Sequence, residues 1–247
     1  MTVRTAPLVR IERVRKEFRA VVAIEAVTLE VNTGEIVALV GDNGAGKSTV
    51  VKCIAGVYQP TAGRILLGGQ PVRFASPLDA RSDGIEVVFQ DLALANAQPV
   101  YMNMFLGREL VKGPLRLLDR ETMAAETKRL LDELDVRIDS PQKMMRDLSG
   151  GQRQGVAIAR AMHWAQRLVL MDEPTAALGV GETQRVEELI RRMRDRGTAI
   201  LLVSHSLDQV FRLADRICVL RHGKQVGVQR SSETTGEEIV SMITGLR

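Results

Sequence analysis

The segment GDNGAGKST at residues 41–49 follows the apolar run EIVALV at residues 35–40. The run is typical of a short buried strand, and a helix is expected from Ser48 to Gly56. Glycines let successive backbone N–H groups turn inward, and the first turn of a helix adds positive potential for an anion. This context predicts a phosphate-binding loop, although a glycine turn before an ordinary helix is the alternative. The candidate binding residues are Gly41, Asp42, Asn43, Gly44, Ala45, Gly46, Lys47, Ser48 and Thr49.

Two side chains of this loop have chemistry that suits a nucleoside triphosphate. We expect the Lys47 ammonium to reach the β- and γ-phosphates. We expect the Ser48 hydroxyl to bind Mg²⁺. The loop therefore predicts ATP and Mg²⁺ as its ligands.

A second apolar run, residues 168–171, ends in the acid pair Asp172 and Glu173. Carboxylates at the end of a buried strand fit the ligand-binding edge of an open α/β sheet. We expect Asp172 to belong to the Mg²⁺ shell, and Glu173 to orient or deprotonate the attacking water. Taken alone, the pair would be interpreted as an acidic turn before Pro174.

The sequence LSGGQ at residues 148–152 lies at the start of an expected helix. Its glycines and the helix N-terminus predict a second anion site that contains no lysine. The candidate residues are Ser149, Gly150, Gly151 and Gln152. The alternative is a glycine N-cap on an ordinary helix, which the presence of the other motifs disfavours.

Strand-like and helix-like segments alternate over much of the chain, and this predicts an α/β fold with a parallel core. Strands are expected at residues 8–14, 27–31, 35–40, 64–67, 85–89, 167–171, 198–204 and 216–220. Helices are expected at residues 48–56, 77–84, 120–135, 150–162, 182–196 and 206–214, and near residue 237. Turns are expected at residues 32–34, 60–63 and 222–223. Residues 92–162 contain no convincing strand and predict an inserted helical block.

The composition excludes several classes of protein. The chain has 247 residues, of which 45% are hydrophobic and 26% are charged, as in globular proteins. Its net charge of +4 is dispersed, and the few aromatic residues (3%) disfavour a single-strand nucleic-acid binder. Cys53 and Cys218 match no metal or redox spacing and predict buried thiols in a reducing cytosol. No signal peptide or membrane span is expected, because the longest uncharged stretch is residues 92–107 and contains polar residues.

The motifs occur in a fixed order: the phosphate loop, Gln90 after a strand, LSGGQ, the acid pair, and His205 after another strand. This order resembles the nucleotide-binding subunit of an ATP-binding cassette (ABC) transporter, over nearly the whole chain. The resemblance implies a P-loop NTPase (RecA-like) parallel core with an N-terminal antiparallel β-subdomain and an inserted helical subdomain. The β-subdomain and core would comprise about residues 1–90 and 163–247, and the helical signature subdomain about residues 91–162.

The resemblance also assigns roles to single residues. Phe18 is similar to the aromatic residue that stacks on adenine, and the alternative is a core residue at a strand end. Gln90 is similar to the residue that joins Mg²⁺ and the attacking water to the helical subdomain. His205 is similar to the histidine that touches the γ-phosphate, and it joins Lys47 and Glu173 as a catalytic candidate. His163 and His222 are interpreted as ordinary structural residues.

The resemblance implies that two cassettes face each other head to tail, each ATP lying between one phosphate loop and the partner's LSGGQ. Segments 72–85, 87–94, 104–109 and 176–179 are similar to the monosaccharide branch of bacterial importers, in particular the single-cassette, fructose-type members. The implied partners are a second cassette, as a homodimer or a separate chain, integral-membrane permease subunits and, indirectly, a periplasmic or extracellular sugar-binding protein. The chain would lie at the cytoplasmic face of the inner membrane, and no nucleic-acid partner is expected.

Other functions are weighed against this one. A soluble cassette that acts on nucleic acid or ribosomes usually has paired cassettes, coiled-coil insertions or basic extensions, and none is visible. A binding-only cassette is disfavoured because Lys47, Glu173 and His205 are all present. A P-loop GTPase is disfavoured because the sequence has no N-K-x-D motif.

Gly179 departs from the usual pattern, in which Ala-Leu-Asp follows the acid pair and the aspartate links the two sites of a dimer. Here the sequence is Ala177-Leu178-Gly179. One interpretation is that Gly179 permits a turn with positive φ and makes its contacts through the backbone. The other is that communication between the sites is weakened.

Overall fold

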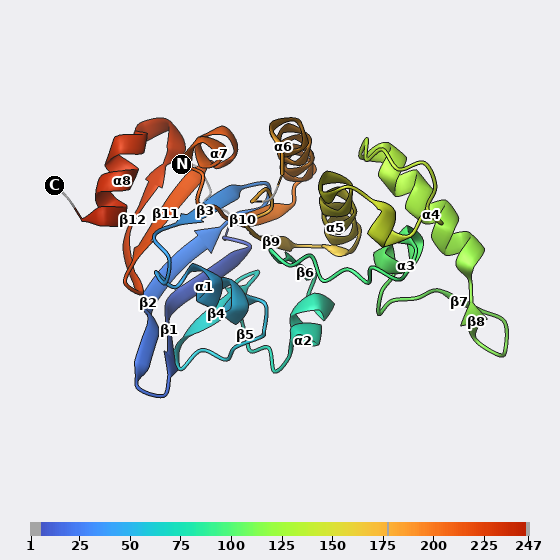
Figure 1. Ribbon diagram of the computed structural model, residues 1–247. Helices are drawn as coiled ribbons and strands as arrows, with labels where there is room; N and C mark the ends of the chain where they lie inside the picture. Colours follow the sequence, from blue (N-terminus) through green and yellow to red (C-terminus); the bar gives the residue numbers. More distant parts are fainter. Residues whose placement is uncertain (1–5, 177, 246–247) are drawn as a thin grey trace. The chain divides into compact units, whose positions relative to one another are not determined.

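The computed structural model describes residues 6–176 and 178–245. Its strands are β1 (Val9–Phe18), β2 (Val21–Val31), β3 (Ile36–Val40), β4 (Ala62–Leu67), β5 (Gln70–Val72), β6 (Ile85–Val88), β7 (Val111–Lys112), β8 (Leu117–Leu118), β9 (Leu168–Asp172), β10 (Ala199–Val203), β11 (Arg216–Arg221) and β12 (Lys224–Arg230). Its α-helices are α1 (Lys47–Ile54), α2 (Pro77–Ser82), α3 (Val100–Met104), α4 (Arg120–Glu133), α5 (Gly150–Trp164), α6 (Val180–Asp195), α7 (Leu207–Leu213) and α8 (Gly236–Thr244). Figure 1 shows these elements along the chain.

One large sheet has the strand order β5-β4-β1-β2-β12-β11-β3-β10-β9-β6. Strands β9, β10, β3 and β11 run parallel, with Leu201 of β10 in register with both Val37 and Leu170. Strands β1, β2, β4 and β5 pair in antiparallel fashion. The predicted combination of a parallel core and an N-terminal antiparallel region is therefore confirmed.

The described chain divides into two compact units. The first unit comprises residues up to Val87, Ala165–Glu173 and residues from Ile190 onward. The second unit comprises Val88–Trp164 and Pro174–Leu189. The helical subdomain expected at residues 91–162 stays a prediction, and the bounds of the second unit differ from it by including residues 174–189.

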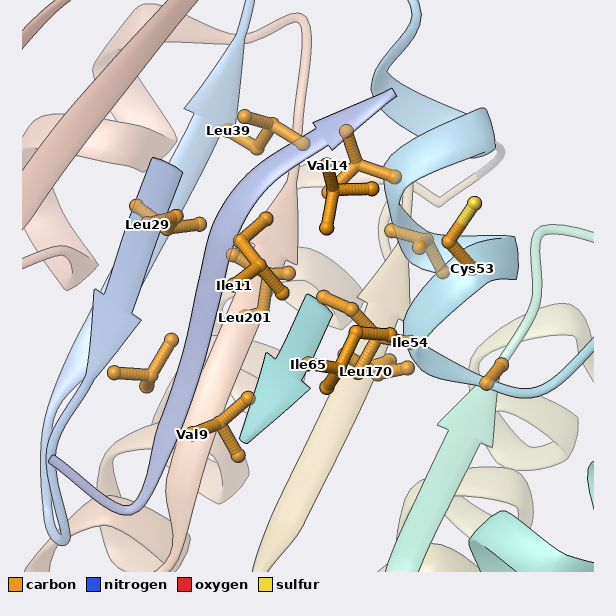
Figure 2. Packing of buried hydrophobic residues seen from close by; sticks show 14 of the residues in the cluster. Val9, Ile11, Val14, Leu29, Leu39, Cys53, Ile54, Ile65, Leu170 and Leu201 are labelled. Carbon is orange, nitrogen blue, oxygen red and sulfur yellow. The ribbon is translucent and has the colours of Figure 1, made fainter. Parts of the chain in front are cut away.

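The hydrophobic core of the first unit gathers side chains from the sheet and from α1. Ile11, Ile54, Ile65, Leu170 and Leu201 are all less than 5% exposed, and Figure 2 shows them in one cluster. These residues come from four strands and one helix that are far apart in the sequence, so burying them fixes α1 against the sheet. The position of α1 in turn fixes the loop that precedes it.

Both cysteines are buried and free, as the sequence predicts. Burial raises the pKa of Cys53 to about 11 and that of Cys218 to about 12. The thiolate form is therefore scarce at neutral pH, and both residues act as small apolar side chains.

Several short elements differ from the sequence-based expectations. The two-residue strands β7 and β8 form a hairpin inside the segment expected to lack strands. Strands β5 and β12 and the helix α3 were also not expected. The turn expected at residues 60–63 is partly wrong, because β4 begins at Ala62. Gly63 belongs to this strand with φ +81°, and a Cβ there would lie 2.3 Å from the Arg13 carbonyl oxygen, so the glycine permits a close approach to β1.

Within residues 6–176 and 178–245, no helix combines the length and the apolar character needed to cross a membrane.

Candidate functional site

The loop that joins β3 to α1 contains three glycines with positive φ, and a larger residue would clash at two of them. Gly41 has φ +148°, and a Cβ there would lie 2.1 Å from the Leu220 carbonyl oxygen. Gly46, the N-cap of α1, has φ +100°, and its Cβ would lie 2.5 Å from Ile24. Gly44 has φ +78°, and a Cβ there would meet no atom within 4 Å. Close packing thus holds the ends of the loop, while Gly44 lies at an open position suited to a ligand.

Lys47 is the buried cation of this loop. Its side chain is 6% exposed, and Nζ donates hydrogen bonds to the carbonyl oxygens of Gly41 (2.6 Å) and Asp42 (2.9 Å). Burial lowers the pKa of Lys47, and the nearby carboxylates of Glu173 and Asp172 oppose this shift. The ammonium group is therefore held inside the loop, where it can interact with an anion.

The acid pair lies at the carboxyl end of β9. Asp172 is the last residue of the strand and is in register with Val203 of β10. Glu173 follows it with φ +54°, and its backbone N–H donates to the Val203 carbonyl oxygen at 3.0 Å. A left-handed backbone is uncommon for a glutamate and costs on the order of 1–3 kcal/mol, so the surrounding structure imposes it.

The carboxylate of Glu173 faces His205, which follows β10. Nε2 of His205 lies 3.2 Å from Oε1 of Glu173, and the His205 backbone N–H donates to Oε2 at 3.4 Å. Oε1 accepts no hydrogen bond from the described residues, so its contact with Nε2 is an ion pair only when His205 is protonated. Burial raises the pKa of Glu173, and the proximity of His205 opposes this rise. A carboxylate with these neighbours is suited to accept a proton.

Phe18 lies at the end of β1, in the same unit. The residue is 39% exposed, and its ring packs edge-on against Tyr58 at a centroid distance of 4.9 Å. Nζ of Lys16 lies 5.1 Å from the Phe18 ring centre. The interpretation of Phe18 as a core residue is therefore wrong, and its role as an adenine-stacking residue stays a prediction.

The other predicted site residues belong to the second unit. Gln90 is exposed and lies two residues after β6. Ser149, Gly150, Gly151 and Gln152 lie at the start of α5. Lys47, Ser48, Asp172, Glu173 and His205, by contrast, all lie in the first unit.

The start of α5 is a capping box. The Gln152 backbone N–H donates to Oγ of Ser149 at 3.2 Å, and the Ser149 backbone N–H donates to Oε1 of Gln152 at 3.0 Å. Nε2 of Gln152 also donates to the Arg137 carbonyl oxygen at 2.9 Å. These reciprocal bonds define the first turn of the helix and fix the position of the serine hydroxyl.

Sequence reasoning missed one residue of this region, Glu182 in the first turn of α6. Its Oε1 accepts hydrogen bonds from Oγ of Ser149 and from the Gly151 backbone N–H, both at 3.2 Å. Its Oε2 accepts a longer bond, 3.4 Å, from the Gly179 backbone N–H. Glu182 and Gly151 are 31 positions apart, and no motif or periodicity in the sequence relates them.

The proposed left-handed turn at Gly179 is not present. Gly179 is absent from the described residues with positive φ, and a Cβ there would meet nothing within 4 Å. Its backbone N–H does make a contact, but the acceptor is a carboxylate oxygen of Glu182. Ala177, which precedes it in the motif, lies outside the described residues.

The two remaining histidines have structural surroundings. His163 packs edge-on against Phe105 and Trp164, with ring centres 5.7 and 4.5 Å away, and burial lowers its pKa. His222 has φ +47° in the turn that joins β11 to β12. These positions agree with the interpretation of both as ordinary structural residues.

The donors around the phosphate loop suit a magnesium ion that also binds phosphate. Among the described residues, no group of three or more His, Cys, Asp or Glu side chains could hold a metal ion by itself. Mg²⁺ is usually bound through one or two protein oxygens together with substrate phosphates and water. The Ser48 hydroxyl and the Asp172 carboxylate are donors of this kind, so the residues fit the ion.

Comparisons with known proteins agree with this geometry. The family described as "ABC transporter" matches residues 24–176. The xylose/arabinose import ATP-binding protein XylG of Sulfolobus acidocaldarius is 46% identical over 237 residues, which cover 96% of the chain and 94% of the relative. The fructose import ATP-binding protein FrcA of Rhizobium meliloti is 43% identical and covers 98% of the chain and 95% of its own length.

The fold is also similar to that of solved structures. The crystal structure of an ATP-binding cassette of an ABC transporter in its ADP conformation superimposes with a TM-score of 0.83. It is 25% identical and covers 98% of the chain and 96% of its own length. The similarity therefore extends over nearly the whole chain and is not limited to the motifs.

Proposed function

Because the chain belongs to the ABC transporter family, we propose that it is the ATP-hydrolysing subunit of an importer that takes up monosaccharides. The observation that carries the ATPase assignment is the group of Lys47, Glu173 and His205 in the first unit. The burial of Lys47, the partial burial of Glu173 and the contacts of both side chains support this assignment of a cation and a proton acceptor to one phosphate loop.

The chemistry follows from these residues. Phosphoryl transfer to water passes through a transition state with dispersed negative charge, which Lys47 and the N–H groups at the start of α1 stabilise. Glu173 orients the attacking water and accepts its proton, a contribution of about 10²- to 10⁴-fold. His205 contacts the γ-phosphate and holds the Glu173 carboxylate in place through its backbone N–H.

Ser48, Asp172 and Gln90 are the residues proposed to bind Mg²⁺. The ion neutralises phosphate charge when it is bound. The base of ATP stacks on Phe18, and its phosphates lie along residues 41–49 of the loop. Exposure of the Phe18 ring supports this assignment.

Each ATP is completed by a second cassette. Ser149, Gly150, Gly151 and Gln152 of that cassette bind the phosphate, because they form a helix N-terminus with a fixed serine hydroxyl. We infer a homodimer in which each chain contributes one phosphate loop and one signature segment to two sites.

The relatives support the import of a sugar. Their names specify xylose/arabinose import and fructose import, and the chain matches both over nearly their whole length. The remaining partners are integral-membrane permease subunits and, indirectly, a periplasmic or extracellular sugar-binding protein, with no nucleic acid. The chain is then peripheral, at the cytoplasmic face of the inner membrane.

Affinity purification of the tagged chain from detergent-solubilised membranes tests this function. We expect an integral-membrane permease to co-purify, and we expect a monosaccharide with its binding protein to stimulate ATP hydrolysis in proteoliposomes. Lys47→Ala should retain the permease but show no stimulation. Recovery of ribosomes or nucleic acid in place of a permease would contradict the proposal.

A further inference from the structure

The chain places one of its own carboxylates on the donors of the signature segment. Oε1 of Glu182 accepts hydrogen bonds from Oγ of Ser149 and from the Gly151 backbone N–H. These are two of the groups that the proposed function gives to the ATP phosphate of the second cassette. All three residues lie in the second unit, so the contact is internal to it.

The residue at position 151 matters for this contact. A Cβ on Gly151 would lie 2.6 Å from both Cδ and Oε1 of Glu182 and 2.8 Å from its Cγ. Real Cβ atoms do not approach other atoms so closely, so any side chain at this position would displace the carboxylate. Gly151 thus does more than expose a backbone N–H, because it leaves the volume that Glu182 fills.

The Glu182 carboxylate also contacts a second segment, at Gly179. Oε2 accepts a hydrogen bond from the Gly179 backbone N–H, at the position where related cassettes usually have an aspartate. Gly179 and Glu182 are three residues apart, at the start of α6. The chain therefore lacks an acid at position 179 but has one that contacts both this position and the signature segment.

We propose that the Glu182 carboxylate occupies the signature donors in the free cassette, and that the phosphate of the second cassette's ATP must displace it. This inference rests on the proposed function. Two anions cannot share the same donors, because the Ser149 hydroxyl and the Gly151 N–H each have one proton to donate. Hydrogen bonds to ionised groups are stronger than neutral ones, so the competition has a measurable cost.

ATP-dependent dimerisation measures this competition. In a Glu173→Gln background, which retains ATP, the ATP concentration for half-maximal dimer is determined by analytical ultracentrifugation with and without Glu182→Gln. Glutamine keeps the shape of the side chain but removes its charge. We expect the required ATP concentration to fall by about tenfold.

Glu188→Gln is the matched control, since it removes the same charge from the same helix and should leave the midpoint unchanged. A direct test of the contact needs no dimer: in the monomer, the Gly151 amide resonance should shift far more on Glu182→Gln than on Glu188→Gln. Glu182→Asp, a shorter acid that reaches the donors less well, should lower the ATP requirement by less than Glu182→Gln.

The outcomes separate the two proposals. If Glu173→Gln alone forms no dimer at any ATP concentration, the proposal of an ATP site shared by two cassettes is wrong. The proposed competition between Glu182 and phosphate is then wrong as well. If it dimerises but Glu182→Gln leaves the midpoint unchanged or raises it, the competition is wrong and the proposed function stands. If neither Glu182→Gln nor Glu182→Asp folds, Glu182 is a structural residue and the inference is overturned.

Discussion

The starts of α1 and α5 are both glycine-rich helix N-termini, but their side chains differ. At α1, no described side chain caps the helix and its first turn has no acid, while Nζ of Lys47 is held by two loop carbonyl groups. At α5, Ser149 and Gln152 form a capping box, and Glu182 adds a carboxylate. One N-terminus thus has its own cation, and the other has its own anion.

Under the proposed function, this difference predicts that the two motifs bind phosphate in different ways. The cation at α1 adds to the positive potential of the helix N-terminus, so this loop can hold ATP within a single cassette. If the Glu182 carboxylate occupies the donors at α5 as proposed, this segment binds only a phosphate that displaces it. ATP should therefore bind at the phosphate loop first and recruit the second cassette afterwards.

Removing the cation has the largest expected effect. Lys47→Ala should reduce ATP hydrolysis to background, a loss of at least about 10³-fold, because the buried ammonium is the main positive side chain at the loop. Radiolabelled phosphate release measures it. Lys128→Ala, which removes an exposed lysine from α4, is the control and should keep full activity. Normal hydrolysis by Lys47→Ala would show that the helix N-terminus alone suffices.

Removing the base should have a somewhat smaller effect. Glu173→Gln should reduce turnover by about 10²- to 10⁴-fold while ATP binding persists, since the phosphate loop is unchanged. The ATP should remain trapped, and gel filtration with ATP should show a dimer. Equal turnover in wild type and variant would contradict the assignment of Glu173 as the base.

The expected effect of pH on turnover is intermediate in size. Burial raises the pKa of Glu173 above its usual value of 4.5, and only the ionised carboxylate accepts a proton. Turnover should therefore fall about tenfold per pH unit on the acid side, beginning at a higher pH than for an exposed glutamate. His205 opposes the rise, so His205→Ala should move this limb to still higher pH. Circular dichroism at each pH checks that the chain stays folded, and a limb that moves to lower pH would contradict the geometry.

The smallest expected effect on ATP hydrolysis is that of a substitution at Gly179, just before α6. Gly179→Asp should change ATP hydrolysis by less than about tenfold, about 1.4 kcal/mol. A Cβ at this position meets nothing within 4 Å, and Glu182 already supplies a carboxylate to the backbone N–H. Steady-state kinetics of Gly179→Asp and Gly179→Asn separate the added charge from the added side chain. A much larger gain in rate or cooperativity from Asp alone would show that the missing carboxylate matters.

The sequence predicts the parallel core well, because β3, β9 and β10 are apolar runs with clear boundaries. It cannot predict β7 and β8, since two residues are too few to show a period. The turn expected at residues 60–63 is partly wrong, because its last two residues, Ala62 and Gly63, belong to β4.

The residues of the candidate site, like the elements of the fold, can be predicted only in part from the sequence. Lys47, Ser149 and Glu173 follow from local motifs, in which spacing along the chain reflects spacing in the fold. Glu182 does not, because its contact with Gly151 joins two segments that meet only after folding. The prediction of a positive φ at Gly179 is also wrong, because a glycine permits that conformation without requiring it.

The central claim is that each ATP lies between the phosphate loop of one chain and the signature segment of another. Mixing Lys47→Ala with Gly151→Asp chains tests it most directly, with ATP-dependent dimer formation as the readout. A mixed dimer places both defects in one site and leaves the other intact. Because an added Cβ at position 151 would meet Glu182, Ser149→Ala serves as a second, milder signature variant. We predict that the mixture binds ATP in a dimer while each variant alone does not. If the mixture forms no more ATP-dependent dimer than the separate variants, the claim is contradicted.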